Sequence, residues 1–135
     1  MSVLSIDTQP PSGVDVHALR TRLGGDLIEP GDPRWDEARR AWNLAVDQRP
    51  FAVALVDSAE DVVALVRFAR VHGLRIAPQG TGHGASALES LEDTILVKTE
   101  RMRGVGIDAA ARRARVEAGA TWAGPFAAAA GTSAS

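Results

Sequence analysis

Apolar residues recur at helical spacing in three segments of the chain, and this pattern predicts a helix in each. The expected helices span residues 15–23, 34–43 and 59–72. Ser58 stands where its hydroxyl can cap the third helix, and Gly73 follows that helix, where glycine commonly ends one. The third helix is therefore delimited at both ends.

Short apolar runs between and after these helices predict strands. They lie at residues 51–56, 75–77, 94–97, 104–107 and 113–117. The first two strands and the helix between them form a β-α-β unit, whose strands are expected to lie parallel with a right-handed crossover. The later strands are separated by polar or glycine-containing breaks and predict a strand meander. The expected fold class is α+β.

The composition is that of an ordinary globular chain, with 45% hydrophobic and 24% charged residues. Its length of 135 residues fits one domain. Residues 1–14 are rich in serine and proline, which predicts a flexible lead-in. We expect the folded unit to span residues 15–126. Residues 127–135 form a low-complexity tail of Ala, Gly, Ser and Thr, which we interpret as a helix interrupted by truncation.

The charge balance argues against binding to polyanions. Fifteen Lys and Arg residues stand against 17 Asp and Glu, a formal net charge of -2, so no overall positive field would attract nucleic acid or an anionic membrane. No apolar run reaches the ~18 residues of a membrane span, and the start lacks signal-peptide features. We expect a cytoplasmic protein with no nucleic-acid and no membrane partner. The neighbouring Arg112, Arg113 and Arg115 are interpreted as a solvated strand face.

The chain contains no cysteine, which excludes disulfides, a thiolate nucleophile and cysteine-bound metal within it. Its three histidines, His17, His72 and His83, are widely separated, so no metal site is expected. Redox chemistry would therefore have to come from a cofactor.

The most informative segment runs from Gln79 to Ala85 and reads Gln-Gly-Thr-Gly-His-Gly-Ala. Its glycines, Gly80, Gly82 and Gly84, alternate directly after a predicted strand. Glycine loses the most conformational entropy on folding and is used where the backbone must bend or be approached closely. Exposed N–H groups in such a loop can form a nest for a phosphate. The alternative is a mobile surface turn without a ligand.

A nicotinamide dinucleotide is one candidate ligand. Gly80, Gly82 and Ala85 satisfy G-x-G-x-x-G/A, and Glu100 follows Gly80 by twenty residues, as in the Rossmann fingerprint. That fingerprint requires a crossover helix after the loop, but only about eight residues, 86–93, precede the next predicted strand. An NAD(P)-binding Rossmann-type module is therefore the second hypothesis.

His83, at the centre of the loop, admits two interpretations. A single histidine commonly has a structural, hydrogen-bonded role. Between glycines, however, its imidazole has no neighbouring side chain to block its approach to a ligand, and a neutral imidazole nitrogen is a competent nucleophile.

Seven short segments follow one another in a specific order between about residues 19 and 122. They are Pro30-Gly31-Asp32-Pro33, Trp42-Asn43, Arg49-Pro50, the helix end Ala69-Arg70-Val71-His72-Gly73, the Gly-x-Gly-His-Gly loop, Arg101-Met102 and Val116-Glu117-Ala118-Gly119-Ala120-Thr121-Trp122. In this order and spacing they resemble the berberine-bridge-type FAD-linked oxidases. These are flavoproteins whose FAD domain is shared with vanillyl-alcohol oxidase and p-cresol methylhydroxylase (PCMH).

The resemblance implies the N-terminal part of a PCMH-type FAD-binding domain, made of the β-α-β unit and the meander. It implies that the FAD pyrophosphate lies against the glycine loop, and that His83 matches the histidine commonly joined to the 8α carbon of the flavin. The second segment near the cofactor is the turn at Gly119. The cofactor-binding residues expected on this basis are Gln79, Gly80, Thr81, Gly82, His83, Gly84, Ala85, Gly119 and Ala120.

The loop departs from the family pattern. The family's loop usually begins with Arg, followed by a small residue and paired glycines before the His, where this chain has Gln79, Gly80, Thr81 and Gly82. Without that cation, backbone N–H groups would carry more of the anion binding.

By resemblance, the full-length protein would take a hydride from a C–H bond of a small-molecule substrate onto flavin and pass the electrons to an acceptor such as oxygen. Proteins of this family are considerably longer, and their catalytic base would correspond to residues beyond Ser135, so no catalytic residue is assigned. We expect an N-terminal fragment that is inactive alone. A non-enzymatic fragment is the third hypothesis.

Overall fold

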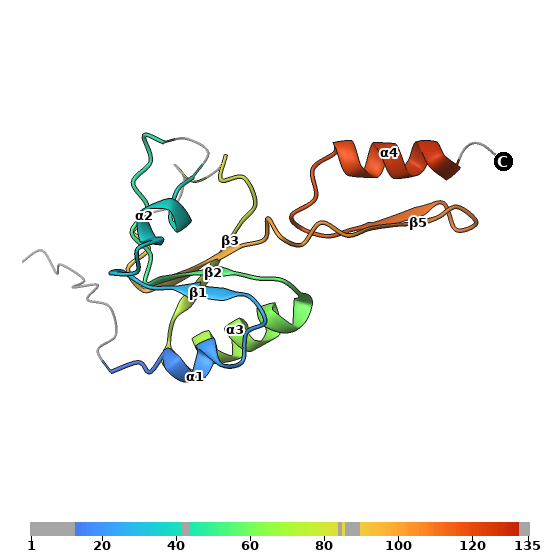
Figure 1. Cartoon of the computed structure of the whole chain (residues 1–135). Coiled ribbons are helices and arrows are strands. Elements are labelled where there is room, and N and C mark those ends of the chain that lie inside the picture. Colours follow the sequence, from blue (N-terminus) through green and yellow to red (C-terminus); the bar gives the residue numbers. More distant parts are fainter. Residues whose placement is uncertain (1–12, 42–43, 84, 86–89, 133–135) are drawn as a thin grey trace, which may run out of the picture.

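A four-stranded mixed sheet forms the centre of the protein (Figure 1). The computed structural model describes residues 13–41, 44–83, 85 and 90–132. The strands, in their order across the sheet, are β1 (Asp26–Ile28), β2 (Ala52–Leu55), β4 (Thr94–Lys98) and β3 (Arg75–Gln79). β1 pairs with β2 antiparallel, whereas β4 pairs parallel with both β2 and β3.

Helices cover both faces of this sheet. α1 (His17–Arg20) and α3 (Ala59–His72) lie on one face, and α2 (Trp35–Ala38) lies on the other (Figure 1). Alternate residues of a strand point to opposite faces. Ile95 accordingly shares a core cluster with Leu65 of α3, whereas the next residue, Leu96, shares one with Ala38 of α2. By the same alternation Lys98, two residues after Leu96, belongs to the α2 face.

α3 has the bounds that its sequence predicts. The Ser58 hydroxyl accepts a hydrogen bond from the backbone N–H of Asp61 at 3.4 Å. Gly73 ends the helix with a φ of 66°, a left-handed conformation that glycine adopts without steric cost. Local capping thus accounts for both ends.

The first two helices are shorter than predicted, and backbone groups after each of them form hydrogen bonds with side chains elsewhere in the fold. After α1, the N–H groups of Gly24 and Gly25 donate to the side chain of Asp61 in α3, at 2.8 and 3.0 Å. After α2, the carbonyl oxygen of Arg40 accepts from the side chain of Lys98 at 2.7 Å. Residues 42–43 of the second predicted helix lie outside the described residues.

The mixed sheet confirms the expected fold class, but β4 does not belong to a meander. It lies between β2 and β3, which are parallel as predicted without being neighbours. All five residues of β4 are buried, and such a continuous buried run is typical of a central parallel strand. The strand β1 was not predicted, because three residues are too few to form a pattern, and its pairing with β2 defines it.

The remaining strands form a separate hairpin. β5 (Val105–Asp108) and β6 (Arg113–Val116) pair antiparallel, and α4 (Ala123–Thr132) lies along them, away from the sheet (Figure 1). Every residue of β6 is exposed, as the interpretation of Arg113 and Arg115 as a solvated face requires. The tail contains the expected helix, which begins at Ala123. None of the helices in the described ranges is long and apolar enough to cross a membrane.

Candidate ligand-binding site

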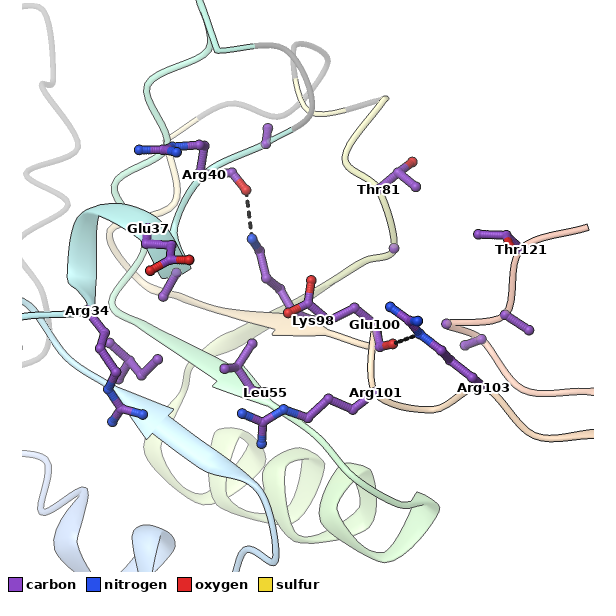
Figure 2. A pocket seen from close by; sticks show the side chains of 17 residues that line it. Arg34, Glu37, Arg40, Leu55, Thr81, Lys98, Glu100, Arg101, Arg103 and Thr121 are labelled. Carbon is purple, nitrogen blue, oxygen red and sulfur yellow. Dashed lines mark hydrogen bonds between the residues drawn. The ribbon is translucent and has the colours of Figure 1, made fainter. Parts of the chain in front are cut away.

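An open cavity of about 950 Å³ is lined by residues of several chain segments. They include α2 and the residues after it, the glycine loop after β3, the end of β4, and the turn after β6 (Figure 2). The lining includes Gly80 and Thr81 from the loop and Gly119 and Ala120 from the turn. The structure thus brings together two segments that the family resemblance assigned to one ligand.

Hydrogen bonds hold the turn against the end of β4. The hydroxyl of Thr99 donates to the carbonyl oxygen of Ala118 at 3.2 Å, and the N–H of Gly119 donates to the carbonyl oxygen of Met102 at 2.8 Å. A Cβ on Gly119 would lie 1.8 Å from the Thr99 carbonyl oxygen. Only glycine permits this approach, so Gly119 shapes the cavity through its lack of a side chain.

The backbone donors of the two segments are used differently. In the turn, the N–H groups of Gly119 and Ala120 are already bonded to carbonyl oxygens of the chain. In the loop, no acceptor is found among the described residues for the N–H groups of Gly80, Thr81 and Gly82. Gly80 and Thr81 are exposed, so among the described residues the loop is the segment whose free donors a ligand can reach.

The rest of the loop faces a smaller cavity of about 400 Å³, which shares Gly80 and Thr81 with the larger one. Gly82, His83 and Ala85 line it. The imidazole Nδ1 of His83 forms a hydrogen bond with the hydroxyl of Thr81, in which the donor depends on the imidazole tautomer. His83 is exposed. Gly84 lies outside the described residues.

Gln79 does not line the larger cavity, but it lines the smaller one beside Gly82 and His83. Its side chain is buried and its Nε2 donates to the carbonyl oxygen of Arg40 at 3.5 Å. Its Oε1 is buried without a hydrogen-bond partner in the described part of the chain. Gly82, at a φ of 85°, packs so closely that a Cβ there would lie 2.7 Å from Gln79 Nε2. In this arrangement the Gln79 side chain packs between the loop at Gly82 and the Arg40 carbonyl group.

Basic side chains outnumber acidic ones around the larger cavity. The basic residues are Arg34, Arg40, Lys98, Arg101 and Arg103, and the acidic ones are Glu37 and Glu100 (Figure 2). Within the described ranges, Arg40, Lys98 and Arg103 form no ion pair with a carboxylate. The cavity therefore has three cations that pair with no carboxylate among the described residues.

Arg101 and Arg34 are instead fixed by carboxylates at the rim of the cavity. Arg101 pairs with Asp26 of β1 at 2.8 Å and with Asp57 at 3.4 Å. The hydrogen bond that Arg101 donates to Asp26 raises the pKa of Arg101 above its ordinary value. Arg34 pairs with Asp32 at 3.3 Å. Because Asp26 also pairs with Arg34 at 3.7 Å, these ion pairs connect β1 to the start of α2 and to the segment after β4.

Lys98 is a site residue that the sequence interpretation missed. It is 8% exposed, and its Nζ donates to the carbonyl oxygen of Arg40 at 2.7 Å. Burial lowers its pKa below the usual 10.5, although the charges of Glu100 and Glu37 act in the opposite direction. One signal was available: Lys98 is the chain's single lysine among 15 basic residues, and it ends an apolar run.

The described residues bear differently on a metal ion and on a nicotinamide dinucleotide as ligands. In the described ranges, no group of three or more His, Asp or Glu side chains is placed to hold a metal ion. Glu100 lines the same cavity as Gly80, as the dinucleotide fingerprint would require. The helix that this fingerprint expects after Ala85 falls on residues 86–89, outside the described ranges.

Residues 50–131 match a family model described as an FAD binding domain. Among curated proteins, (R)-6-hydroxynicotine oxidase of Paenarthrobacter nicotinovorans is 33% identical over 97 residues, which cover 72% of this chain and 21% of that protein. Glucooligosaccharide oxidase of Sarocladium strictum is 33% identical over 95 residues, covering 69% and 19%. The chain spans about a fifth of the length of the curated relatives it matches.

Two solved structures are similar to this chain in both sequence and fold. The flavoenzyme CrmK, described as involved in shunt product recycling in caerulomycin biosynthesis, aligns with a TM-score of 0.67 at 30% identity, over 77% of this chain and 21% of CrmK. Wild-type BBE-like 1 of Physcomitrella patens aligns with a TM-score of 0.65 at 28% identity, over 78% and 23%.

Proposed function

The chain belongs to the FAD binding domain family, and on this premise we propose that it forms part of the FAD site of an oxidoreductase. The pyrophosphate of FAD would lie in the larger cavity, against the glycine loop. The observation that carries this proposal is the set of unpaired N–H groups of Gly80, Thr81 and Gly82 beside cations that no carboxylate neutralises in the described residues.

The residues present suit a pyrophosphate. Its two negative charges require hydrogen-bond donors and positive charge, and consecutive backbone N–H groups provide such donors without a side chain in the way. Arg40 and Arg103 line the same cavity, and Arg103 is held in place by its hydrogen bond to the Glu100 carbonyl oxygen at 2.6 Å. The loop would bind the phosphates and thereby orient the rest of the cofactor.

FAD, when bound, supplies a two-electron acceptor. For the whole protein we propose oxidation of a small-molecule substrate, with oxygen as the electron acceptor. Two relatives are named as oxidases, which supports this class of reaction. The present chain would contribute cofactor binding, and we assign it no catalytic residue.

FAD titration of the full 135-residue chain, followed by flavin fluorescence, tests the proposal. Riboflavin has the same ring without phosphates, and NAD has a pyrophosphate without the flavin. We expect FAD to bind at clearly lower concentrations than either. Equal affinity for FAD and riboflavin would contradict the pyrophosphate site, and preferential binding of NAD would favour the Rossmann alternative.

His83 is the residue that we propose to attach the flavin covalently. In that bond an imidazole nitrogen of His83 replaces one hydrogen of the 8α carbon, and molecular oxygen takes up the two hydrogens lost, one from each partner. Its exposed position in the smaller cavity supports this role.

To test the covalent bond, the chain is incubated with FAD in air and precipitated with acid. Flavin absorbance is expected in the wild-type pellet and not in that of His83→Ala. Two colourless pellets would contradict the covalent bond.

A further inference from the structure

Among the described residues, the buried ammonium group of Lys98 uses only one of its hydrogen-bond donors. An ammonium has three N–H donors, and one of them binds the carbonyl oxygen of Arg40 at 2.7 Å. Across the described residues, no carboxylate lies within ion-pair distance, 4.0 Å, of its Nζ. A buried charge without a partner of opposite charge is costly. The fold therefore tolerates a cost that an anion would offset.

The fold places this ammonium in the larger cavity. Lys98 is the last residue of β4, and the alternation of the strand directs its side chain to the α2 face. Figure 2 shows the side chain extending from the strand end toward Arg40, with the glycine loop at Thr81 on the other side of the cavity. Lys98, Gly80 and Thr81 line the same space.

The neighbouring carboxylates do not act as counter-ions. Glu37 and Glu100 also line the cavity, and their charges favour the protonated lysine, but neither reaches it. Arg40, through its charge, disfavours protonation. Lys98 is therefore a desolvated cation in a cavity where the N–H groups of Gly80 and Thr81 have no acceptor among the described residues.

A lysine at this position is unusual for the composition of this chain. The other 14 basic residues of the chain are all arginines. An ammonium is a compact point charge with rotatable donors, whereas a guanidinium is a larger planar group. The compact group can bind the Arg40 carbonyl and still direct donors at a ligand within a cavity.

We infer that Lys98 is a ligand-binding residue, whose ammonium forms an ion pair with a phosphate oxygen of the bound dinucleotide. The inference rests on the proposed function, because it takes the phosphate from FAD. An anionic substrate group could offer similar chemistry, so the test compares ligands that carry the phosphates with one that does not.

The first experiment measures dissociation constants of FAD, riboflavin and inorganic pyrophosphate for the full chain. Lys98→Met removes the charge and keeps the length of the side chain, Lys98→Arg retains the charge, and Arg70→Met removes one charge from the exposed surface of α3 on the opposite face. Loss of a hydrogen bond to a charged group predicts that Lys98→Met weakens FAD and pyrophosphate binding about tenfold or more. Riboflavin binding should be unchanged, Lys98→Arg should retain most of the affinity, and Arg70→Met all of it.

A second measurement does not depend on a variant that folds. Because Lys98 is the only lysine, the chain has two amines, and the α-amino group serves as an internal reference for acetylation followed by mass spectrometry. We expect FAD and pyrophosphate to protect Lys98 from acetylation relative to the α-amino group, and riboflavin not to. Equal modification with and without saturating FAD would overturn the inference.

The outcomes separate the two proposals. If the wild-type chain binds FAD and Lys98→Met binds it as tightly as Arg70→Met does, the inference on Lys98 is wrong and the proposed function stands. If the chain binds pyrophosphate in a Lys98-dependent way and does not bind FAD, the proposed function is wrong, while Lys98 is an anion-binding residue. If neither ligand binds, both are wrong.

Discussion

The carboxylate of Asp61 accepts a hydrogen bond from the backbone N–H of Gly24, 37 residues earlier in the chain, at 2.8 Å. Its other oxygen accepts from the N–H groups of Gly25 and Asp57, both at 3.0 Å. One side chain in the first turn of α3 thus receives three backbone donors. It fixes the turn between α1 and β1 to the start of the helix, and β1 in turn completes the sheet edge beside the cavity.

Replacement of this carboxylate should destabilise the chain. In Asp61→Asn one acceptor oxygen becomes an NH₂ group, which leaves buried backbone donors unsatisfied. We expect a loss of about 2 kcal/mol in the free energy of unfolding. Urea denaturation followed by circular dichroism measures it. Glu60→Gln, an exposed change in the same helical turn, is the matched control and should cost little; equal midpoints for the two variants would contradict the role of Asp61.

The same carboxylate predicts an acid-dependent loss of stability. Burial raises the pKa of Asp61, but the hydrogen bonds from Asp57, Gly24 and Gly25 outweigh it and lower the pKa below 3.8. Because the folded-state pKa lies below the unfolded value, the unfolded state binds more protons as the pH falls. The stabilisation is complete well above pH 4 and is lost as the pH falls through the folded-state pKa. Urea midpoints measured downward from pH 6 should fall more steeply for wild type than for Asp61→Asn, and parallel curves would argue against it.

Two glycines with contrasting surroundings test the close approach between the turn at Gly119 and the end of β4. A Cβ on Gly119 would lie 1.8 Å from the Thr99 carbonyl oxygen, whereas a Cβ on Gly106 would meet nothing within 4 Å. Gly119→Ala must separate the turn from the end of β4, and we expect a cost of about 3 kcal/mol. Gly106→Ala should cost nothing measurable. Thermal unfolding of both variants checks the difference, and an equally stable Gly119→Ala would show that the turn is placed differently.

A second pair of glycines isolates the contact between Gly82 and Gln79. Both Gly82 and Gly31 have positive φ, 85° and 99°, so an alanine at either costs about 1–2 kcal/mol in backbone strain. At Gly82 the new Cβ would also press on Gln79 Nε2, whereas at Gly31 it would meet nothing within 4 Å. We expect Gly82→Ala to destabilise the chain more and to weaken FAD binding, with Gly31→Ala leaving binding intact. Weaker binding in both variants would point to a general effect on folding.

Local signals explain what the sequence predicted well. Ser58 and Gly73 delimit α3 through bonds within a few residues, so its bounds follow from the chain alone. The alternating glycines identified the loop at Gly80 because their pattern depends on the backbone rather than on distant partners. The expected closeness of this loop to Gly119 came from the family resemblance, and the structure places both segments at one cavity.

Non-local contacts determine the structural features that the sequence did not reveal. The position of β4 between β2 and β3 depends on strand pairing, which no local pattern encodes. Gln79 was expected near the ligand from the family resemblance, and no local pattern indicates that its side chain contacts Arg40, 39 residues away. No sequence pattern indicated Lys98 as a site residue, because it is a single residue at the end of a strand. Its place in the site follows from the cavity that it lines.

The chain's only lysine leads to a prediction at alkaline pH. Burial lowers the pKa of Lys98 below 10.5 in the folded chain, with Glu100 and Glu37 acting against this shift. The unfolded state therefore binds more protons between the two pKa values, and stability should rise with pH across that interval. The chain has no Tyr or Cys, so only the α-amino group titrates nearby, about two pH units lower. Urea midpoints between pH 8 and 10.5 should rise for wild type and stay level for Lys98→Met. Saturating FAD should suppress the rise, because a phosphate paired with the ammonium keeps it protonated; a level wild-type profile without ligand would contradict the buried, unpaired state of Lys98.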